Sequence, residues 1–112
     1  MTGAKVVTID PDSNVVTLIN VYEVEPERQA ELVRLLAEVT DTVMRRQPGF
    51  VSVNIHSSFD GTRVVNYAQW ASKEDFERLM KNPDAQAQIG RLAAVAKSVQ
   101  PALYRVSSVH AG

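Results

Sequence analysis

The chain contains no cysteine, which excludes disulfide bonds, thiolate catalysis and cysteine-ligated metal sites. It also lacks an excess of charge of either sign. The 12 Lys and Arg residues are balanced by 13 Asp and Glu residues, and no run of like charge occurs. We therefore expect neither nucleic acid nor an anionic membrane as the main partner. No apolar stretch approaches the roughly 20 residues of a membrane helix. The N-terminus lacks the apolar region and cleavage site of a signal peptide, so we expect a cytoplasmic protein.

The composition is that of an ordinary globular protein. Hydrophobic residues make up 45% of the 112 positions. A chain of this length buries about two-thirds of the surface that it exposes when unfolded, which suffices for one modest core. We predict a single domain over residues 1–112, with its core at about 15–109.

The first part of the chain predicts a strand followed by a helix. β-branched residues dominate positions 15–24, and their alternation puts Leu18, Asn20 and Tyr22 on one face. Residues 5–9 are ambiguous and could form another short strand. Pro26 stands where a helix begins, and apolar residues then recur at helical spacing as far as Met44. These positions are Leu32, Leu35, Leu36, Val39 and Val43.

A hairpin is predicted next. Residues 50–58 form a second strand, and the pair Asp60-Gly61 is a strong signal for a tight turn into a third strand that ends at Trp70. The two strands should therefore pair antiparallel. Simple alternation in the second strand puts Phe50, Ser52, Asn54 and His56 on one face, and Val51, Val53 and Ile55 on the other.

The remaining elements complete a known order. Ser72 and the acidic residues after it resemble a capping box that starts a helix. Asn82-Pro83 interrupts this helix, and a further helix begins at about Asp84. Pro101 opens a last strand over residues 102–109. The order β-α-β-β-α-β is that of the ferredoxin-like fold, an α+β class with helices on one face of a four-stranded antiparallel sheet.

The other face of the predicted sheet should not be left in water. By the alternation above, it is apolar through Val51, Val53, Ile55 and Val65. A face this apolar is usually a protein interface. We therefore expect a two-fold homodimer that packs sheet to sheet.

Two polar side chains of the third strand, Asn66 and Trp70, share a face with Val64 and Ala68. An amide and an indole N–H on an apolar face are costly unless they meet a side chain, a water or a ligand. A buried tryptophan is common in ordinary cores. Asparagine is disfavoured inside strands, and we therefore interpret the pair as ligand-binding.

Several segments together resemble the antibiotic biosynthesis monooxygenase family. They are residues 48–50 (PGF), His56, 60–62 (DGT), 64–70 (VVNYAQW) and Ser72. The likeness runs from about residue 15 to the last strand and is closest to the small quinone-forming enzymes of actinomycete polyketide pathways. It implies a dimeric α+β barrel that oxidises an anthrone-type phenol to a quinone with O₂ and needs no metal, flavin or haem.

The resemblance also implies a chemical task for each residue. The deprotonated substrate reduces O₂ directly, so the protein has to stabilise an enolate oxygen, move protons and exclude water. Asn66 and Trp70 match the donor pair that would bind the substrate oxygen and the developing peroxide. His56 matches a histidine on the neighbouring strand and is a candidate proton shuttle.

The expected substrate-binding residues are Asn20, Tyr22, Phe76 and Arg91. Asn20 and Tyr22 should line the cavity. Phe76 stands where the family has a tyrosine, so a phenol donor is missing there. Arg91 is the nearest counterpart of a helix arginine of the family, although a solvent-facing position is the commoner one for such a residue.

Other functions stay open on the same scaffold. The cavity could perform a non-redox cyclisation or isomerisation, or it could bind an aromatic ligand without chemistry. Asn20 and Trp70 also resemble residues of haem-degrading relatives, but the stretch 71–100, where their axial histidine belongs, contains no histidine. The two histidines, His56 and His110, lie far apart in the sequence, and no Asp, Glu and His set has metal-site spacing.

Overall fold

The computed structural model describes residues 5–112. Its strands are β1 (Val16–Glu23), β2 (Phe50–Ser57), β3 (Arg63–Trp70) and β4 (Ser98–Tyr104). Its α-helices are α1 (Gln29–Thr42), α2 (Lys73–Met80) and α3 (Pro83–Val95), and two 3₁₀ turns, Pro26–Arg28 and Met44–Arg46, flank α1.

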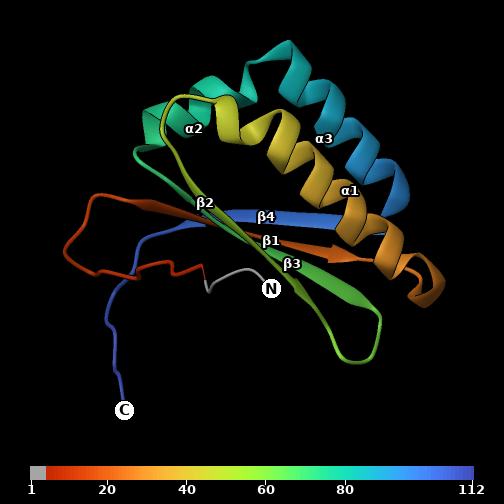
Figure 1. Ribbon diagram of the computed structural model, residues 1–112, viewed down its shortest axis with the longest axis horizontal. Helices are drawn as coiled ribbons and strands as arrows, with labels where there is room; N and C mark the ends of the chain where they lie inside the picture. Colours follow the sequence, from red (N-terminus) through yellow and green to blue (C-terminus); the bar gives the residue numbers. More distant parts are fainter. Residues whose placement is uncertain (1–4) are drawn as a thin grey trace.

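The four strands form one antiparallel sheet in the order β2-β3-β1-β4. All three helices lie on the same face of this sheet, and the C-terminal end of the chain lies on the other side (Figure 1). This order and layering confirm the predicted α+β, ferredoxin-like fold. We call the side covered by helices the helix face and the opposite side the outer face.

The core lies between the helices and the helix face. Helix α1 buries Leu32, Leu36 and Val39, as its 3.6-residue periodicity predicts. The helix ends at Thr42 rather than at Met44, because Val43 leaves the helical region with φ −122° and ψ −57°. The apolar stripe nevertheless continues, since Met44 is buried in the short turn that comes next.

Local capping places α2 and α3 as the sequence predicts. The Ser72 hydroxyl accepts a hydrogen bond from the backbone N–H of Asp75 at 3.1 Å, which is the N-cap of α2. Asn82 accepts from two backbone N–H groups of the next turn at 2.9 and 3.1 Å, and Pro83 occupies the first position of α3. The break between α2 and α3 is therefore the N-cap of α3.

The hairpin between β2 and β3 is fixed by Asp60. One oxygen of its carboxylate accepts from the backbone N–H of Thr62 at 3.0 Å and from the hydroxyls of Thr62 and Ser58 at 2.7 and 2.8 Å. These three hydrogen bonds lower the pKa of Asp60 from 3.8 to about 2, and the bond from the backbone N–H of Thr62 has the largest effect. Gly61 supplies the positive φ of 81° that the turn requires.

The sheet edges differ from the sequence-based expectations in two ways. Residues 5–9, which the sequence left ambiguous, form no strand, although Gln69 donates to the carbonyl oxygen of Thr8 at 2.9 Å. Strand β4 covers Ser98–Tyr104, so it starts earlier than residue 102 and ends well before residue 109. Pro101 lies inside β4 because this strand pairs only with β1, and an edge strand can lack one N–H on its free side.

A β-bulge near the start of β2 changes which residues share a face. Phe50 pairs with Trp70 and Ser52 pairs with Gln69, so Val51 is an extra residue without a partner. Alternation is thereby shifted by one position. The predicted faces are correct for β1 and β3 but wrong for β2 after Phe50.

The bulge also corrects the composition of the outer face. Val53 pairs with Ala68 and Ile55 with Asn66, so both turn toward the helices and pack against the core. Val51 is 46% exposed at the bulge. Of the four apolar residues expected on the outer face, only Val65 keeps its predicted regular position there.

Candidate active site

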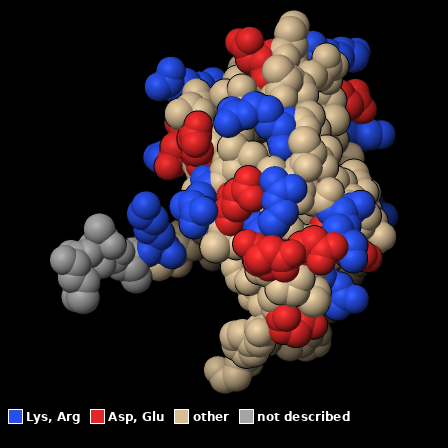
Figure 2. All heavy atoms as spheres, turned by 90° about the vertical axis from the view of Figure 1, so that its right-hand side faces the viewer, with Lys and Arg blue, Asp and Glu red and all other residues tan. Residues whose placement is uncertain are grey.

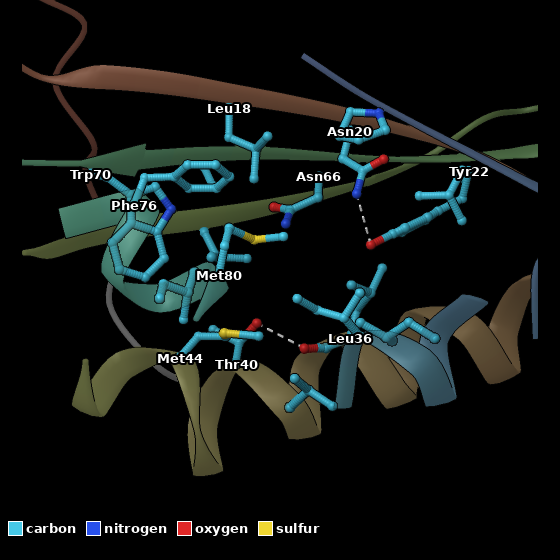
Figure 3. Close-up of a pocket in the computed structure, with 18 of the residues that line it drawn as sticks. Leu18, Asn20, Tyr22, Leu36, Thr40, Met44, Asn66, Trp70, Phe76 and Met80 are labelled. Atoms are coloured by element: carbon cyan, nitrogen blue, oxygen red, sulfur yellow. Dashed lines mark hydrogen bonds between the residues drawn. The ribbon is translucent and has the colours of Figure 1, made fainter. Parts of the chain in front are cut away.

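A cavity of about 410 Å³ lies between the helix face of the sheet and the helices. Its walls are mostly apolar, and Figure 3 shows the side chains that project into it. A cavity of this size and lining suits an apolar small molecule. Its polar lining residues are Asn20, Tyr22, Thr40, Asn66 and Trp70.

Strand register brings the sequence-predicted residues together. Asn20 of β1 lies directly opposite Asn66 of β3, so the two amides are cross-strand neighbours. Trp70 lies four residues further along β3, beside Phe76 of α2, and Tyr22 lies at the other end of the row (Figure 3). The floor of the cavity thus carries an indole, two amides and a phenol in that order.

The indole of Trp70 is only 1% exposed and is held by two aromatic rings. Phe50 packs edge to face against it at a centroid distance of 5.6 Å, and Phe76 does so at 6.5 Å. Its Nε1 atom is buried and has no hydrogen-bond partner among the described residues. Such an unmet donor costs about 1–3 kcal/mol, and the cost is recovered when an acceptor enters the cavity.

The two asparagines leave acceptors unmet as well. The Oδ1 atoms of Asn20 and Asn66 are both buried without a partner in the described part of the chain. The amide nitrogen of Asn20 donates to the hydroxyl of Tyr22 at 3.1 Å. One donor and two acceptors on residues that line the cavity are therefore buried without a partner among the described residues, and an oxygen-bearing ligand is a candidate partner for them.

Within residues 5–112, no charged group lines the cavity. Tyr22 is the only ionisable residue in this described lining, and burial raises the pKa of its phenol from 10.0 to about 12. Tyr22 is therefore neutral at physiological pH. Charged residues lie instead on the surface, where both signs are interspersed on the face shown in Figure 2. In the part of the chain that the structure describes, no side chain that lines the cavity can act as a base in the neutral range.

His56 does not lie with Asn66 and Trp70. It pairs with Val65 on the outer face, is exposed, and its Nδ1 lies 3.2 Å from the carbonyl oxygen of Asn54. The prediction that His56 serves the cavity of its own chain is wrong, because the bulge at Val51 turns the side chain away. The sequence carries no sign of that bulge.

Of the other predicted binding residues, one lies in the cavity and one does not. Phe76 lines the cavity, whereas Arg91 is exposed on α3 and donates to Gln88 at 2.6 Å. Arg91 is therefore a solvent-facing residue of this chain. The sequence interpretation missed Thr40, whose hydroxyl donates to the carbonyl oxygen of Leu36 at 2.7 Å. Its helical spacing from Leu36 would have indicated that it lies on the buried side of α1.

Residues 5–112 offer neither a metal centre nor a membrane span. No three side chains of His, Cys, Asp or Glu gather into a possible metal site within this range. None of the helices described there has the length and apolar character needed to cross a membrane.

A ferredoxin-like sheet with an uncharged, mostly apolar cavity defines a class of small-molecule-binding proteins. The chain belongs to the antibiotic biosynthesis monooxygenase family, whose sequence pattern matches residues 15–91. This confirms the resemblance noted in the sequence and places the chain among monooxygenases.

Individual relatives agree in sequence and in structure. A tetracenomycin-F1 monooxygenase from Streptomyces glaucescens is 48% identical over 79 residues, which are 70% of each protein. A Streptomyces coelicolor monooxygenase from the gene ActVA-Orf6, solved in complex with nanaomycin D, is 26% identical, with a TM-score of 0.78 over 92% of this chain and 96% of its own. SnoaB from Streptomyces nogalater, a cofactor-independent oxygenase, is 25% identical, with a TM-score of 0.75 over 87% and 97% of the two chains.

Proposed function

We propose that this protein oxidises a polycyclic phenol or anthrone to a quinone with O₂ as co-substrate and without metal, flavin or haem. The observation that carries the proposal is the buried N–H of Trp70, which has no partner among the described residues and lies beside an apolar cavity of about 410 Å³ that Asn66 also lines. The tetracenomycin-F1 relative and the cofactor-independent SnoaB support the reaction class.

The reaction needs little from the protein because the substrate supplies the electrons. The reacting carbon of an anthrone loses a proton, and the resulting carbanion reduces O₂ and forms a bond to one of its oxygen atoms. The hydroperoxide then loses water, which leaves the new quinone carbonyl. Trp70 donates its N–H to the oxygen that gains negative charge, and the amide nitrogen of Asn66 donates to the neighbouring oxygen. The first proton passes to water, since no described residue that lines the cavity is a neutral-range base.

The same lining argues against the alternatives. A cyclase or isomerase that works by acid–base catalysis needs a group that titrates near neutrality, and the cavity offers only Tyr22 with a pKa of about 12. Haem degradation needs an axial ligand, and no histidine is among the described residues that line the cavity. Oxygenation of a substrate with its own acidic C–H requires neither.

The decisive experiment measures the consumption of O₂. Purified protein with a dihydroxyanthrone in excess chelator should consume O₂ faster than a protein-free blank, with one quinone formed for each O₂ used. Anaerobic incubation should give no product. Product formation without O₂ would reject oxygenation in favour of a non-redox step, and no product from any of a panel of anthrones and naphthols would favour simple binding.

We also propose that two copies of the chain pack through their outer faces, and that the enzyme works in the cytoplasm. The helices cover only the other side of the sheet (Figure 1), while Ile19, Val21 and Tyr67 remain partly exposed on strands β1 and β3. Burying this surface would stabilise a two-fold dimer. Sedimentation should give twice the chain mass of 12.4 kDa, and Val65→Lys should shift it toward a single chain. A single-chain mass for the unaltered protein would contradict the dimer.

A further inference from the structure

The cavity reaches the surface on one side of the molecule. Most of the described residues that line it are buried or half-buried, and four are exposed. Met80 is the last residue of α2, and the other three, Pro101, Ala102 and Leu103, are consecutive in β4. A residue that lines a cavity and is also exposed lies where the cavity meets solvent. The mouth of the cavity is therefore between the end of α2 and β4.

The packing of the helices explains why the opening is on this side. Helix α1 packs against β2 and β3, and α2 packs against β3, whereas β4 is the edge strand farthest from β2. Pro101 and Leu103 pair with Asn20 and Leu18 of β1, so they belong to the helix face. The mouth consequently stays open to solvent when two copies pack through their outer faces.

The mouth leads to the proposed reacting residues. The sheet order places β1 between β4 and β3, so a ligand that enters over β4 first crosses β1. It passes Leu18 and Asn20 and then meets β3, which carries Asn66 and Trp70. This route crosses no helix.

The two sides of the mouth differ in stiffness. Met80 is 41% exposed, and its unbranched thioether side chain points into the cavity in Figure 3 and can change rotamer easily. Its backbone is held, because its carbonyl oxygen accepts from the side-chain amide of Gln86 at 2.8 Å and the preceding Leu79 is buried. The other side is a hydrogen-bonded strand in which the ring of Pro101 fixes one backbone angle. Movement at the mouth therefore falls on the Met80 side chain.

We propose that Met80 is the gate of this entrance. Its side chain swings outward to admit a flat aromatic ligand past Leu103 and then returns to cover the bound ligand. A rigid ring system cannot bend around an obstacle, so the protein side chain has to move. Closure keeps water out of the cavity, as the oxidation requires. The inference rests on the proposed function for the class of ligand, but its test needs no turnover.

Binding rates distinguish a gate from a wall residue. Trp70 is the only tryptophan of the chain and lines the cavity, so stopped-flow fluorescence can follow the binding of 1,8-dihydroxyanthraquinone, which is already oxidised. Removing a gate lowers the barrier to entry and to exit alike. Met80→Ala should therefore raise the association and dissociation rate constants together, each by about tenfold, and change Kd by less than about threefold. Because Met80 is exposed, this variant should fold normally.

Val53→Ala is the matched control. Val53 lines the cavity from β2, at the opposite edge of the sheet from the mouth. Loss of a wall contact weakens the complex without changing the barrier to entry, so this variant should raise the dissociation rate constant alone. The gate is rejected if Met80→Ala raises only the dissociation rate constant, as Val53→Ala should, or if it alters neither rate constant.

A second experiment tests the position of the mouth. The chain has no cysteine, so one introduced thiol can be labelled selectively. Leu103→Cys carrying a biotin methanethiosulfonate label should associate with the ligand at least about tenfold more slowly, and dithiothreitol should restore the rate by removing the label. Phe59→Cys with the same label on the fully exposed hairpin should associate at the normal rate.

An unchanged association rate for labelled Leu103→Cys would place the entrance elsewhere and overturn the proposal. This failure is distinct from failure of the proposed function. Absent oxygen uptake would count against oxidation, whereas the binding rates of an already oxidised ligand depend on the mouth and on Met80.

Discussion

Trp70→Phe is expected to lower kcat for anthrone oxidation by about 10²-fold, with a much smaller change in KM. The indole N–H is the buried donor available to the oxygen that becomes negatively charged, and removal of one such donor typically costs about 10²–10³ in kcat. The effect falls on kcat because the ground-state carbonyl or phenol needs that donor far less than the enolate does. Initial rates of O₂ uptake and quinone absorbance at several substrate concentrations separate the two constants.

The substitution is chosen to leave the packing largely in place. Phenylalanine keeps a ring between Phe50 and Phe76, so the aromatic contacts that hold the site survive in part. Phe59→Leu serves as the control, because Phe59 is fully exposed at the hairpin and its loss should not alter kcat. If Trp70→Phe turns over at nearly the normal rate, the indole is a core residue and the assignment of the reacting end is wrong.

The part of the site that the sequence predicts correctly lies within single regular elements. Asn66 and Trp70 share a face because β3 is uninterrupted and side chains alternate with a period of two. Asn20 and Tyr22 share a face of β1 for the same reason. The turn at Asp60-Gly61 is also predicted correctly, because its conformation is determined by residues that are neighbours in the sequence.

The errors arise where geometry depends on more than one element. The predicted face of His56 is wrong because one extra residue, Val51, shifts the alternation of β2 by one position. Hydrophobic periodicity predicts neither that a bulge occurs nor where it lies. That Asn20 lies opposite Asn66 depends on the register between β1 and β3, which are separated by a helix and a strand. The outward position of Arg91 depends on how α3 is rotated about its own axis.

Gly49→Ala is expected to destabilise the protein by about 3 kcal/mol, although alanine adds a single methyl group. Gly49 has φ +83°, which costs an alanine roughly 1–2 kcal/mol. The added Cβ would also overlap the side chain of Asp75. That carboxylate accepts from the Ser72 hydroxyl and from Arg78, each at 2.8 Å, so it cannot withdraw without disturbing the start of α2.

The loss of stability should also affect the candidate active site, because Gly49 connects the elements that surround Trp70. Its carbonyl oxygen accepts from the backbone N–H of Ala71 at 2.7 Å, immediately after the indole. Gly90→Ala is the matched control: Gly90 lies inside α3 with no atom near the new Cβ, and alanine should stabilise that helix by about 0.5–1 kcal/mol. Urea unfolding of both variants measures the free energy of unfolding, which should fall for Gly49→Ala and rise for Gly90→Ala. Equal effects from the two substitutions would mean that neither the left-handed backbone nor the contact with Asp75 constrains the approach to the cavity.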